Sequence, residues 1–316
     1  MIRKISLLLL LLTAAARLWT MPKVVVPEAV EPGCPLVVAM KGEQDLEQVG
    51  VSLLNAAGGR LLVAGVFHAG DGGSIVMSLM GIPDYFSPGT YEIEMEGRDG
   101  TNYFWLRRTV KILPRIFAAE DIEFSTDMTD LKNDNEPKRI EEYYQLLAIL
   151  HSFHPAALYH PDSFSFPLEQ LRQTSGFGDR RGYFYADGGR DSSIHAGIDY
   201  GAAAGTPVFA SGKGRVVFSS ARIITGNTVV IEHMPSLYSL YYHLNSLAVR
   251  PDDIVEQGAL LGTVGATGLV TGPHLHWEFR LANVPVDPLW FTGNKVLDMI
   301  KIMSIMDSTA YERGGD

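Results

Sequence analysis

Five residues in the C-terminal half of the chain have the side-chain types needed to bind and use a metal ion. They are His195 and Asp199 in "IHAGIDYG", His243 in "YYHL", and His274 and His276 in "TGPHLHWEF". Imidazole nitrogens and a carboxylate suit Zn²⁺, and a catalytic zinc takes three protein ligands and leaves one position for water. These residue types therefore suit a catalytic zinc site that keeps one position for water.

The spacing of the last two histidines indicates how they are presented. Side chains alternate between the two faces of a β-strand, so His274 and His276 share a face and Leu275 points to the other. One ring can then bind a metal ion while the other lies beside its bound water. Each motif alone has a simpler interpretation: a chance His-x-x-x-Asp, a surface histidine pair, or a half-buried His243 with one hydrogen bond.

The elements that must position these residues are predicted to be strands. Between Leu171 and Trp290, alternating Val, Ile and Tyr residues are interrupted by glycines, as in "GTPVFASGKGRVVFSS" and "GNTVVIEHM". This texture is typical of strands joined by tight turns, and it predicts a compact antiparallel β domain. We place this domain at residues 166–292.

The same region resembles a known family. The segments "TSGFGDRRGYFY", "HAGIDYGAAAGTPVFASGKGRVV", "GNTVVIEHMPSLYSLYYHL", "VEQGALLGTVGATGLVTGPHLHWEF" and "VPVDPLWF" are similar to lysostaphin/LytM-type zinc metalloendopeptidases, which cut peptide bonds in bacterial peptidoglycan. The resemblance covers about 120 residues and includes the spaced His-x-x-x-Asp, Tyr-x-His-Leu and His-Leu-His elements. It implies a LytM-like antiparallel β metallopeptidase domain.

The resemblance also implies roles for the five residues. His195, Asp199 and His276 would hold Zn²⁺, while His243 and His274 would be catalytic and would handle the water and the developing charge. Zinc lowers the pKa of a bound water from about 15.7 to about 7, and an unligated histidine near neutral pKa can move its proton. Which of His243 and His274 is the base stays open.

Two further positions qualify this interpretation. Many relatives carry an arginine where this chain has Ser193, which puts the substrate contacts in doubt and leaves the metal site intact. Glu278 shares strand parity with the two histidines, so it either orients a metal ligand from outside or is an ordinary charge-paired carboxylate. The histidines at 151, 154 and 160 are interpreted as packing or surface residues, because Pro155 interrupts any single helical face.

The fold class predicted for the whole chain is mainly β. Short alternating runs with turn signals at Ala57-Gly58-Gly59 and Asp99-Gly100 predict an immunoglobulin-like β-sandwich over residues 22–117. Residues 118–165 are predicted to be a linker with a helix through "KRIEEYYQLLAILHSF", and residues 293–316 a tail with a short helix around "KVLDMIKIM".

The N-terminus and the composition bear on location and partners. Residues 1–20, "MIRKISLLLLLLTAAARLWT", have the charged start, short apolar run and small residues of a secretory signal peptide, so we expect export to the periplasm or cell envelope. The single cysteine, Cys34, is interpreted as a turn or strand-edge residue, with lipid attachment a minor alternative. A formal net charge of -10 argues against a nucleic-acid partner.

Taken together, the sequence predicts an exported zinc metalloendopeptidase that hydrolyses peptide cross-links of peptidoglycan. The alternative is a non-catalytic LytM-like regulator of cell-wall amidases or a wall-binding module, although such proteins typically lose metal ligands. A structural zinc in an adhesin-like protein is disfavoured, because structural sites are closed by four ligands, often cysteines. The sequence leaves three alternative roles open for the N-terminal domain: positioning the enzyme, binding a cell-envelope protein, or covering the cleft.

Overall fold

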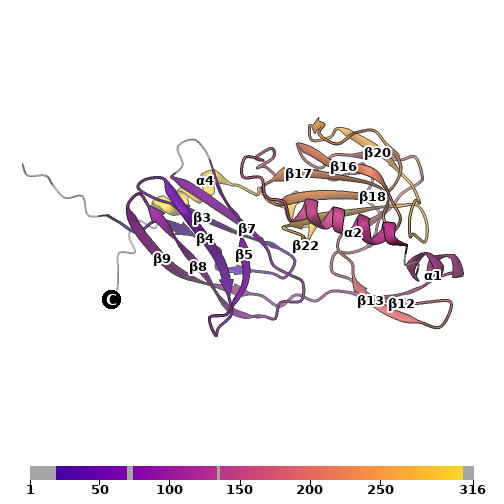
Figure 1. The fold of residues 1–316 in the computed structure, drawn as a ribbon, viewed down its shortest axis with the longest axis horizontal. Helices are drawn as coiled ribbons and strands as arrows, with labels where there is room; N and C mark the ends of the chain where they lie inside the picture. The colour runs from indigo at the N-terminus through magenta and orange to yellow at the C-terminus, as the bar shows by residue number, and fades with distance from the viewer. Residues whose placement is uncertain (1–18, 70–73, 134–135, 309–316) are drawn as a thin grey trace, which may run out of the picture.

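The computed structural model describes residues 19–69, 74–133 and 136–308. Two β-rich regions lie side by side along the long axis and are joined by a segment that carries two helices (Figure 1). The chain is mainly β, as the sequence predicts. The predicted signal peptide falls almost wholly outside the described residues, and no described helix is long and apolar enough to span a membrane.

The N-terminal region contains two sheets. The first has the order β1 (Lys23–Val25), β3 (Pro35–Lys41), β7 (Ile75–Gly81) and β6 (Val66–His68). The second has the order β2 (Ala29–Val30), β9 (Asn102–Ile112), β8 (Gly89–Asp99), β4 (Leu46–Leu54) and β5 (Arg60–Ala64). All their pairings are antiparallel except β2 with β9.

One apolar cluster is shared by these two sheets. Alternate residues of β3 and β7, including Val38 and Met80, pack with residues of β4, β8 and β9 such as Val51, Ile93 and Val110. The predicted turn at Asp99-Gly100 joins β8 to β9, with Gly100 at a φ of 60° that favours glycine. The assignment of an immunoglobulin-like topology to this region stays a prediction.

The C-terminal region is built on a ten-stranded sheet. Its main order is β11 (Gln173–Ser175), β14 (Ile198–Gly201), β21 (His274–Leu281), β18 (Leu237–Leu247), β17 (Gly226–Met234), β16 (Gly214–Arg222) and β19 (Ile254–Val255). Strand β20 (Leu260–Val264) pairs with β18 and β15 (Pro207–Phe209), and β22 (Val284–Val286) pairs with β21. Every pairing is antiparallel, which matches the predicted domain.

The segment between the two β-rich regions contains helices and a strand. Helix α2 (Pro137–Leu150) occupies the predicted helical stretch, and α1 (Thr126–Asn133) precedes it. Strand β10 (Ala119–Glu123) runs parallel to β12 (Arg180–Phe184), which pairs in turn with β13 (Arg190–Ile194). The linker is therefore part of a sheet beside the C-terminal domain, a feature that its composition does not indicate.

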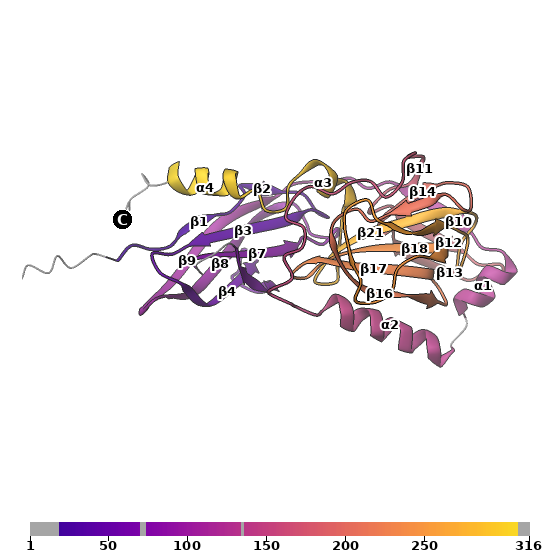
Figure 2. The same ribbon diagram turned by 90° about the horizontal axis from the view of Figure 1, so that it is seen from above.

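The two β-rich regions share a second apolar cluster. It combines Met77 and Leu79 of β7 with Phe279 and Val286 of the C-terminal sheet. An ion pair between Arg115 and Asp287 crosses the same boundary. Helix α3 (Pro288–Gly293) follows this junction, and α4 (Met299–Ser308) returns to lie along β1, a few residues later than the predicted tail helix (Figure 2).

Candidate metal centre

Two neighbouring strands and one tight approach bring the predicted metal ligands together. Strands β14 and β21 are antiparallel, and their register sets Asp199 directly opposite His276. His195 immediately follows β13, and the chain then passes close to β21 at Gly197. A Cβ at position 197 would lie only 2.3 Å from the carbonyl oxygen of Trp277, so only glycine permits this approach.

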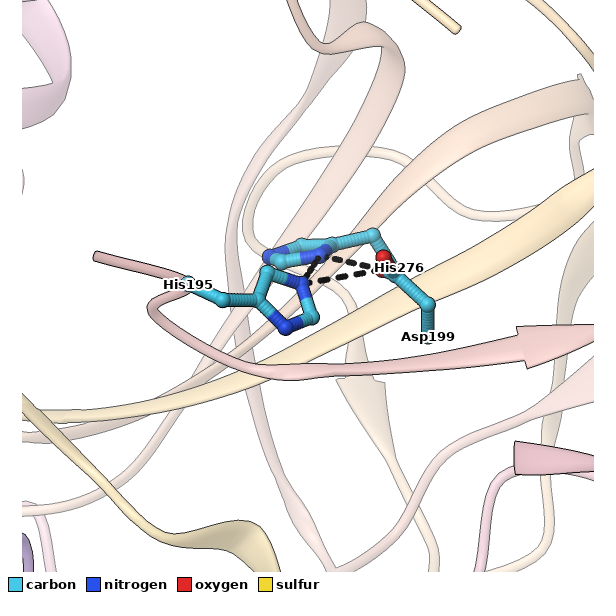
Figure 3. A group of neighbouring side chains, drawn as sticks. All are labelled: His195, Asp199 and His276. Carbon is cyan, nitrogen blue, oxygen red and sulfur yellow. Dashed lines mark hydrogen bonds and ion pairs between the residues drawn. The ribbon is translucent and has the colours of Figure 1, made fainter. Parts of the chain in front are cut away.

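Three inner atoms of these residues converge (Figure 3). His276 Nδ1 lies 2.7 Å from Asp199 Oδ1 and 2.9 Å from His195 Nε2, and His195 Nε2 lies 3.1 Å from Asp199 Oδ1. All three residues are buried. They form the one group of this kind among the residues that the structure describes, and its ligand atoms lie within 4.8 Å of one another.

The outer nitrogens of the two histidines determine what the inner atoms present. His195 Nδ1 lies 2.6 Å from the carbonyl oxygen of Gly176, and His276 Nε2 lies 2.8 Å from Glu278 Oε1. Both partners can only accept, so each outer nitrogen carries the proton and each inner nitrogen of a neutral ring offers a lone pair. Two lone pairs and a carboxylate oxygen then face one another, which fits a bound cation.

The pKa values of the cluster reflect the same arrangement. Burial lowers the pKa of His195. Burial also opposes the charged form of His276, but Asp199 and Glu278 outweigh it and raise its pKa to about 9. Burial raises the pKa of Asp199, but His276 and His195 outweigh it and hold that pKa below its usual range. When no metal ion is bound, His276 is therefore protonated, and its positive charge offsets the negative charge of Asp199.

The two predicted catalytic histidines lie beside this cluster. His274 Nε2 is 3.7 Å from Asp199 Oδ1, and the His243 and His274 ring centroids are 4.9 Å apart. Their Nδ1 atoms lie 2.8 Å from the carbonyl oxygens of Thr267 and Gly272. Each Nδ1 therefore carries a proton, and Nε2 is left free to accept one. The structure brings all five predicted residues together, while their roles stay predictions.

His243 has two further features of a functional residue. Its φ of 62° lies in the left-handed region, which side chains other than glycine rarely adopt and which is concentrated at functional sites. Burial, with contributions from His274 and His276, lowers its pKa to about 3. His243 is therefore neutral over the pH range in which most proteins work.

Glu278 combines the two interpretations that its sequence position leaves open. It accepts from His276 through Oε1, and Oε2 lies 2.6 Å from Arg280 Nε. Burial raises its pKa, but Arg280 and His276 outweigh burial and keep the carboxylate ionised. It is both charge-paired with Arg280 and positioned to orient His276.

Structural contacts account for two tyrosines of β18 and for the sequence-predicted packing residue His154 and turn residue Cys34. Tyr242 stacks on His276 with an interplanar angle of 9°, and Tyr241 accepts from the Ser211 amide in the core. His154 Nδ1 lies 2.6 Å from Glu232 Oε1, away from the cluster. Cys34 lies at the start of β3 in a turn, as expected, and burial raises the pKa of its thiol to about 11.

The hollow beside the cluster offers space for a ligand. It has a volume of about 650 Å³ and is bordered by Gly201 at the end of β14, by Pro273 before His274, and by Arg172 and Thr206. The hollow therefore adjoins the ends of the two strands that carry Asp199 and His274.

Residues 193–288 match the sequence profile of peptidase family M23, and this segment contains all five residues of the site. This segment is therefore similar to peptidase family M23 domains.

Curated relatives agree with this assignment over the same region. The chain is 40% identical over 122 residues to the peptidoglycan DD-endopeptidase ShyC of Vibrio cholerae, which is 39% of this chain and 28% of ShyC. It is 43% identical over 96 residues to the DD-carboxypeptidase/endopeptidase Mpg of Neisseria meningitidis, which is 30% of this chain and 22% of Mpg. The matches thus span less than a third of each relative.

One solved structure resembles most of the chain. A putative M23 peptidase from Pseudomonas aeruginosa is 28% identical, covers 83% of this chain and 94% of its own, and has a TM-score of 0.54. The M23 domain and much of the sequence outside it therefore share an arrangement with that protein.

Sequence reasoning missed two residues next to the M23 site. Arg181 Nη2 lies 2.7 Å from Asp199 Oδ2, and Arg181 Nε lies 2.5 Å from Glu120 Oε1. Arg181 lies in the quoted segment "GDRRGYF", but no local pattern identifies its partners. Glu120 lies within residues 118–165, which the sequence predicts to be a linker.

Proposed function

We propose that this protein is an exported zinc metalloendopeptidase that hydrolyses peptide cross-links of bacterial peptidoglycan. The observation that carries the proposal is the convergence of His195 Nε2, His276 Nδ1 and Asp199 Oδ1, with two further histidines, His243 and His274, beside them. Three donors on a tetrahedral zinc with bonds of about 2.0–2.1 Å lie about 3.3 Å apart. The observed separations of 2.7–3.1 Å need only a small outward shift to reach this spacing.

The three metal ligands and the two neighbouring histidines have different roles in peptide hydrolysis. Zinc bound by the three ligands supplies a Lewis acid for the scissile carbonyl and a water that is acidic near neutral pH. The rings of His243 and His274 lie beside these ligands, so one of them would accept the water's proton and return it to the departing amine. The hydrogen bonds at their Nδ1 atoms fix both rings in the tautomer that this requires.

The substrate class is supported by the names of the relatives. Both ShyC and Mpg are described as endopeptidases, and ShyC as acting on peptidoglycan. The non-catalytic alternative is less well supported, because every ligand and both accessory histidines are present with suitable tautomers. Export to the periplasm or cell envelope, and a cell-envelope protein partner through the N-terminal region, belong to the same proposal.

The decisive experiment measures metal and product together. Purified wild-type protein is expected to bind about one zinc per chain and to release soluble muropeptides from purified sacculi. His276→Ala should lose both properties, whereas His151→Ala, which removes an exposed histidine at the end of α2, should lose neither. A wild-type protein that binds no zinc, or a His276→Ala protein that cuts equally well, contradicts the proposal.

A further inference from the structure

A chain of charged contacts connects the segment between the two β-rich regions to the metal-binding cluster. It begins at Glu120 on β10, passes through Arg181 on β12 and ends at Asp199 on β14. Residues 193–288 match the M23 profile, so the first two members lie outside the matched segment.

The backbone sets the first contact. In the parallel pairing of β10 with β12, Glu120 is the direct register partner of Arg181. Side chains of paired residues lie on the same face of a sheet, so the carboxylate and the guanidinium meet there. Arg181 Nε lies 2.5 Å from Glu120 Oε1, and Arg181 Nη2 donates to Ser175 Oγ at 2.8 Å. Two neighbours thus hold one largely buried guanidinium.

The second contact, between Arg181 and Asp199, gives the two carboxylate oxygens of Asp199 different partners. Arg181 Nη2 donates to Oδ2 at 2.7 Å, while Oδ1 faces His195 Nε2 and His276 Nδ1. The guanidinium therefore holds Oδ2 away from the cluster and leaves Oδ1 as the only oxygen that points into it. A carboxylate fixed in this way offers a metal ion one oxygen in one orientation.

We propose that Glu120 is a positioning residue for the metal centre and that it acts through Arg181 on Asp199. This inference rests on the zinc site of the proposed function. Without Glu120, Arg181 loses the contact that holds its Nε, and its positive charge is balanced by Asp199 alone. Both effects act against a second cation on Asp199, one through geometry and the other through charge.

The proposal gives the connecting segment a function in the site. Strand β10 precedes α1 and is the next strand along the chain after β9, the last strand of the N-terminal region (Figure 2). Strand β13, which leads into His195, pairs with the other edge of β12, so β10, β12 and β13 form one small sheet beside the cluster. Any partner that pulls β10 away from β12 would also release Arg181 and weaken metal binding.

The test measures Zn²⁺ affinity of the full chain by competition with a chromogenic chelator, and the visible spectrum of the Co²⁺-substituted protein. The variants are Glu120→Ala, Glu120→Gln, Arg181→Ala and the Glu120→Ala/Arg181→Ala double variant. Glu123→Ala is the matched control, because it removes the same side chain from the same strand opposite Phe184. Urea unfolding of each variant checks that the protein is folded.

We expect Glu120→Ala to weaken Zn²⁺ binding about tenfold or more, the size typical for residues that orient metal ligands, and to change the Co²⁺ spectrum. Glu120→Gln keeps an acceptor and loses the charge, so it should have a smaller effect in the same direction. Glu123→Ala should bind Zn²⁺ as wild type does. In the Arg181→Ala background, removal of Glu120 should have no further effect.

Two results would overturn the inference. One is wild-type Zn²⁺ affinity in both Glu120 variants, and the other is a Glu120 effect that persists at full size in the Arg181→Ala background. Either can occur in a protein whose wild type binds zinc and cleaves sacculi, so this failure is distinct from failure of the proposed function. A wild type without zinc affinity would instead refute both.

Discussion

Asp199 and His276 face each other across an antiparallel strand pair, with Asp199 Oδ1 2.7 Å from His276 Nδ1. On the far side of the imidazole, Nε2 donates to Glu278, so the ring lies between two carboxylates. These two contacts fix the tautomer of the neutral His276 ring and direct its Nδ1 at the cluster. The two carboxylates also raise the pKa of His276 to about 9. The consequences for metal binding, proton release and catalysis can each be measured.

The first prediction concerns Glu278. Replacing Glu278 with Gln removes the negative charge that orients His276, so Zn²⁺ affinity should fall about 10–100-fold. Chelator competition measures this directly. Glu232→Gln is the matched control, because Glu232 is an equally buried carboxylate of the same sheet that pairs with Arg215 and His154 instead. A Glu278→Gln protein with unchanged zinc affinity would show that the contact does not orient the ligand.

The second prediction concerns pH. The metal-free His276 is protonated below its pKa of about 9, and zinc must displace this proton to reach Nδ1. The apparent Zn²⁺ dissociation constant should therefore rise about tenfold for each pH unit below 9, as long as one proton is released. Calorimetry in buffers of different ionisation enthalpy counts that proton. Zinc binding at pH 7 without proton release would contradict the raised pKa.

Whether a contact in the site can be predicted from the sequence depends on how far apart its two residues lie along the chain. The same-face placement of His274 and His276 follows from strand periodicity alone, and the structure has both on β21. Glu278 follows from the same parity. The contact of Arg181 with Glu120 depends on the register of a parallel pair formed by segments about sixty residues apart, and no local pattern encodes that register.

The fold also consists of local features that the sequence predicts and non-local features that it does not. Turn glycines and alternating residues identify the β8–β9 hairpin and the antiparallel character of the C-terminal sheet, because these are local features. Residues 118–125 fall within the predicted linker, yet β10 forms there because it can pair with the edge of β12. The core shared by the two β-rich regions is equally non-local, since it needs β7 and β22 to meet.

The third prediction separates catalysis from metal binding. His243→Ala and His274→Ala should each keep wild-type zinc content, because neither belongs to the converging trio. Each removes a group that can transfer protons, so the larger kcat loss, about 10²–10⁴-fold, identifies the general base. The measurement pairs zinc analysis with muropeptide release. If either variant loses its zinc, that histidine must be reassigned as a ligand.

The fourth prediction concerns Cys34. Burial raises the pKa of its thiol to about 11, although Arg115 opposes the shift. The thiolate is the reactive form, so at pH 8 about one thiol in a thousand is reactive in the folded protein. Alkylation by iodoacetamide should be about 100-fold slower in the native protein than in urea, as mass spectrometry can follow. Equal rates would contradict the raised pKa.

The last prediction concerns the glycine that allows the chain to approach β21. A methyl group at position 197 would collide with the Trp277 carbonyl oxygen at 2.3 Å, and backbone cannot yield as a flexible side chain does. Gly197→Ala should therefore displace His195 from the cluster, reduce zinc affinity and lower the free energy of unfolding by about 1–3 kcal/mol. Urea denaturation and chelator competition measure the two effects.

The chain supplies a matched control for this substitution. Gly272 is two residues before His274, and a Cβ there would meet nothing within 4 Å. Its carbonyl oxygen, which accepts from His274 Nδ1, is unchanged by an added methyl group. Gly272→Ala should therefore keep both stability and zinc affinity. If the two alanine variants behave alike, the close approach at position 197 is not what holds His195 against Asp199 and His276.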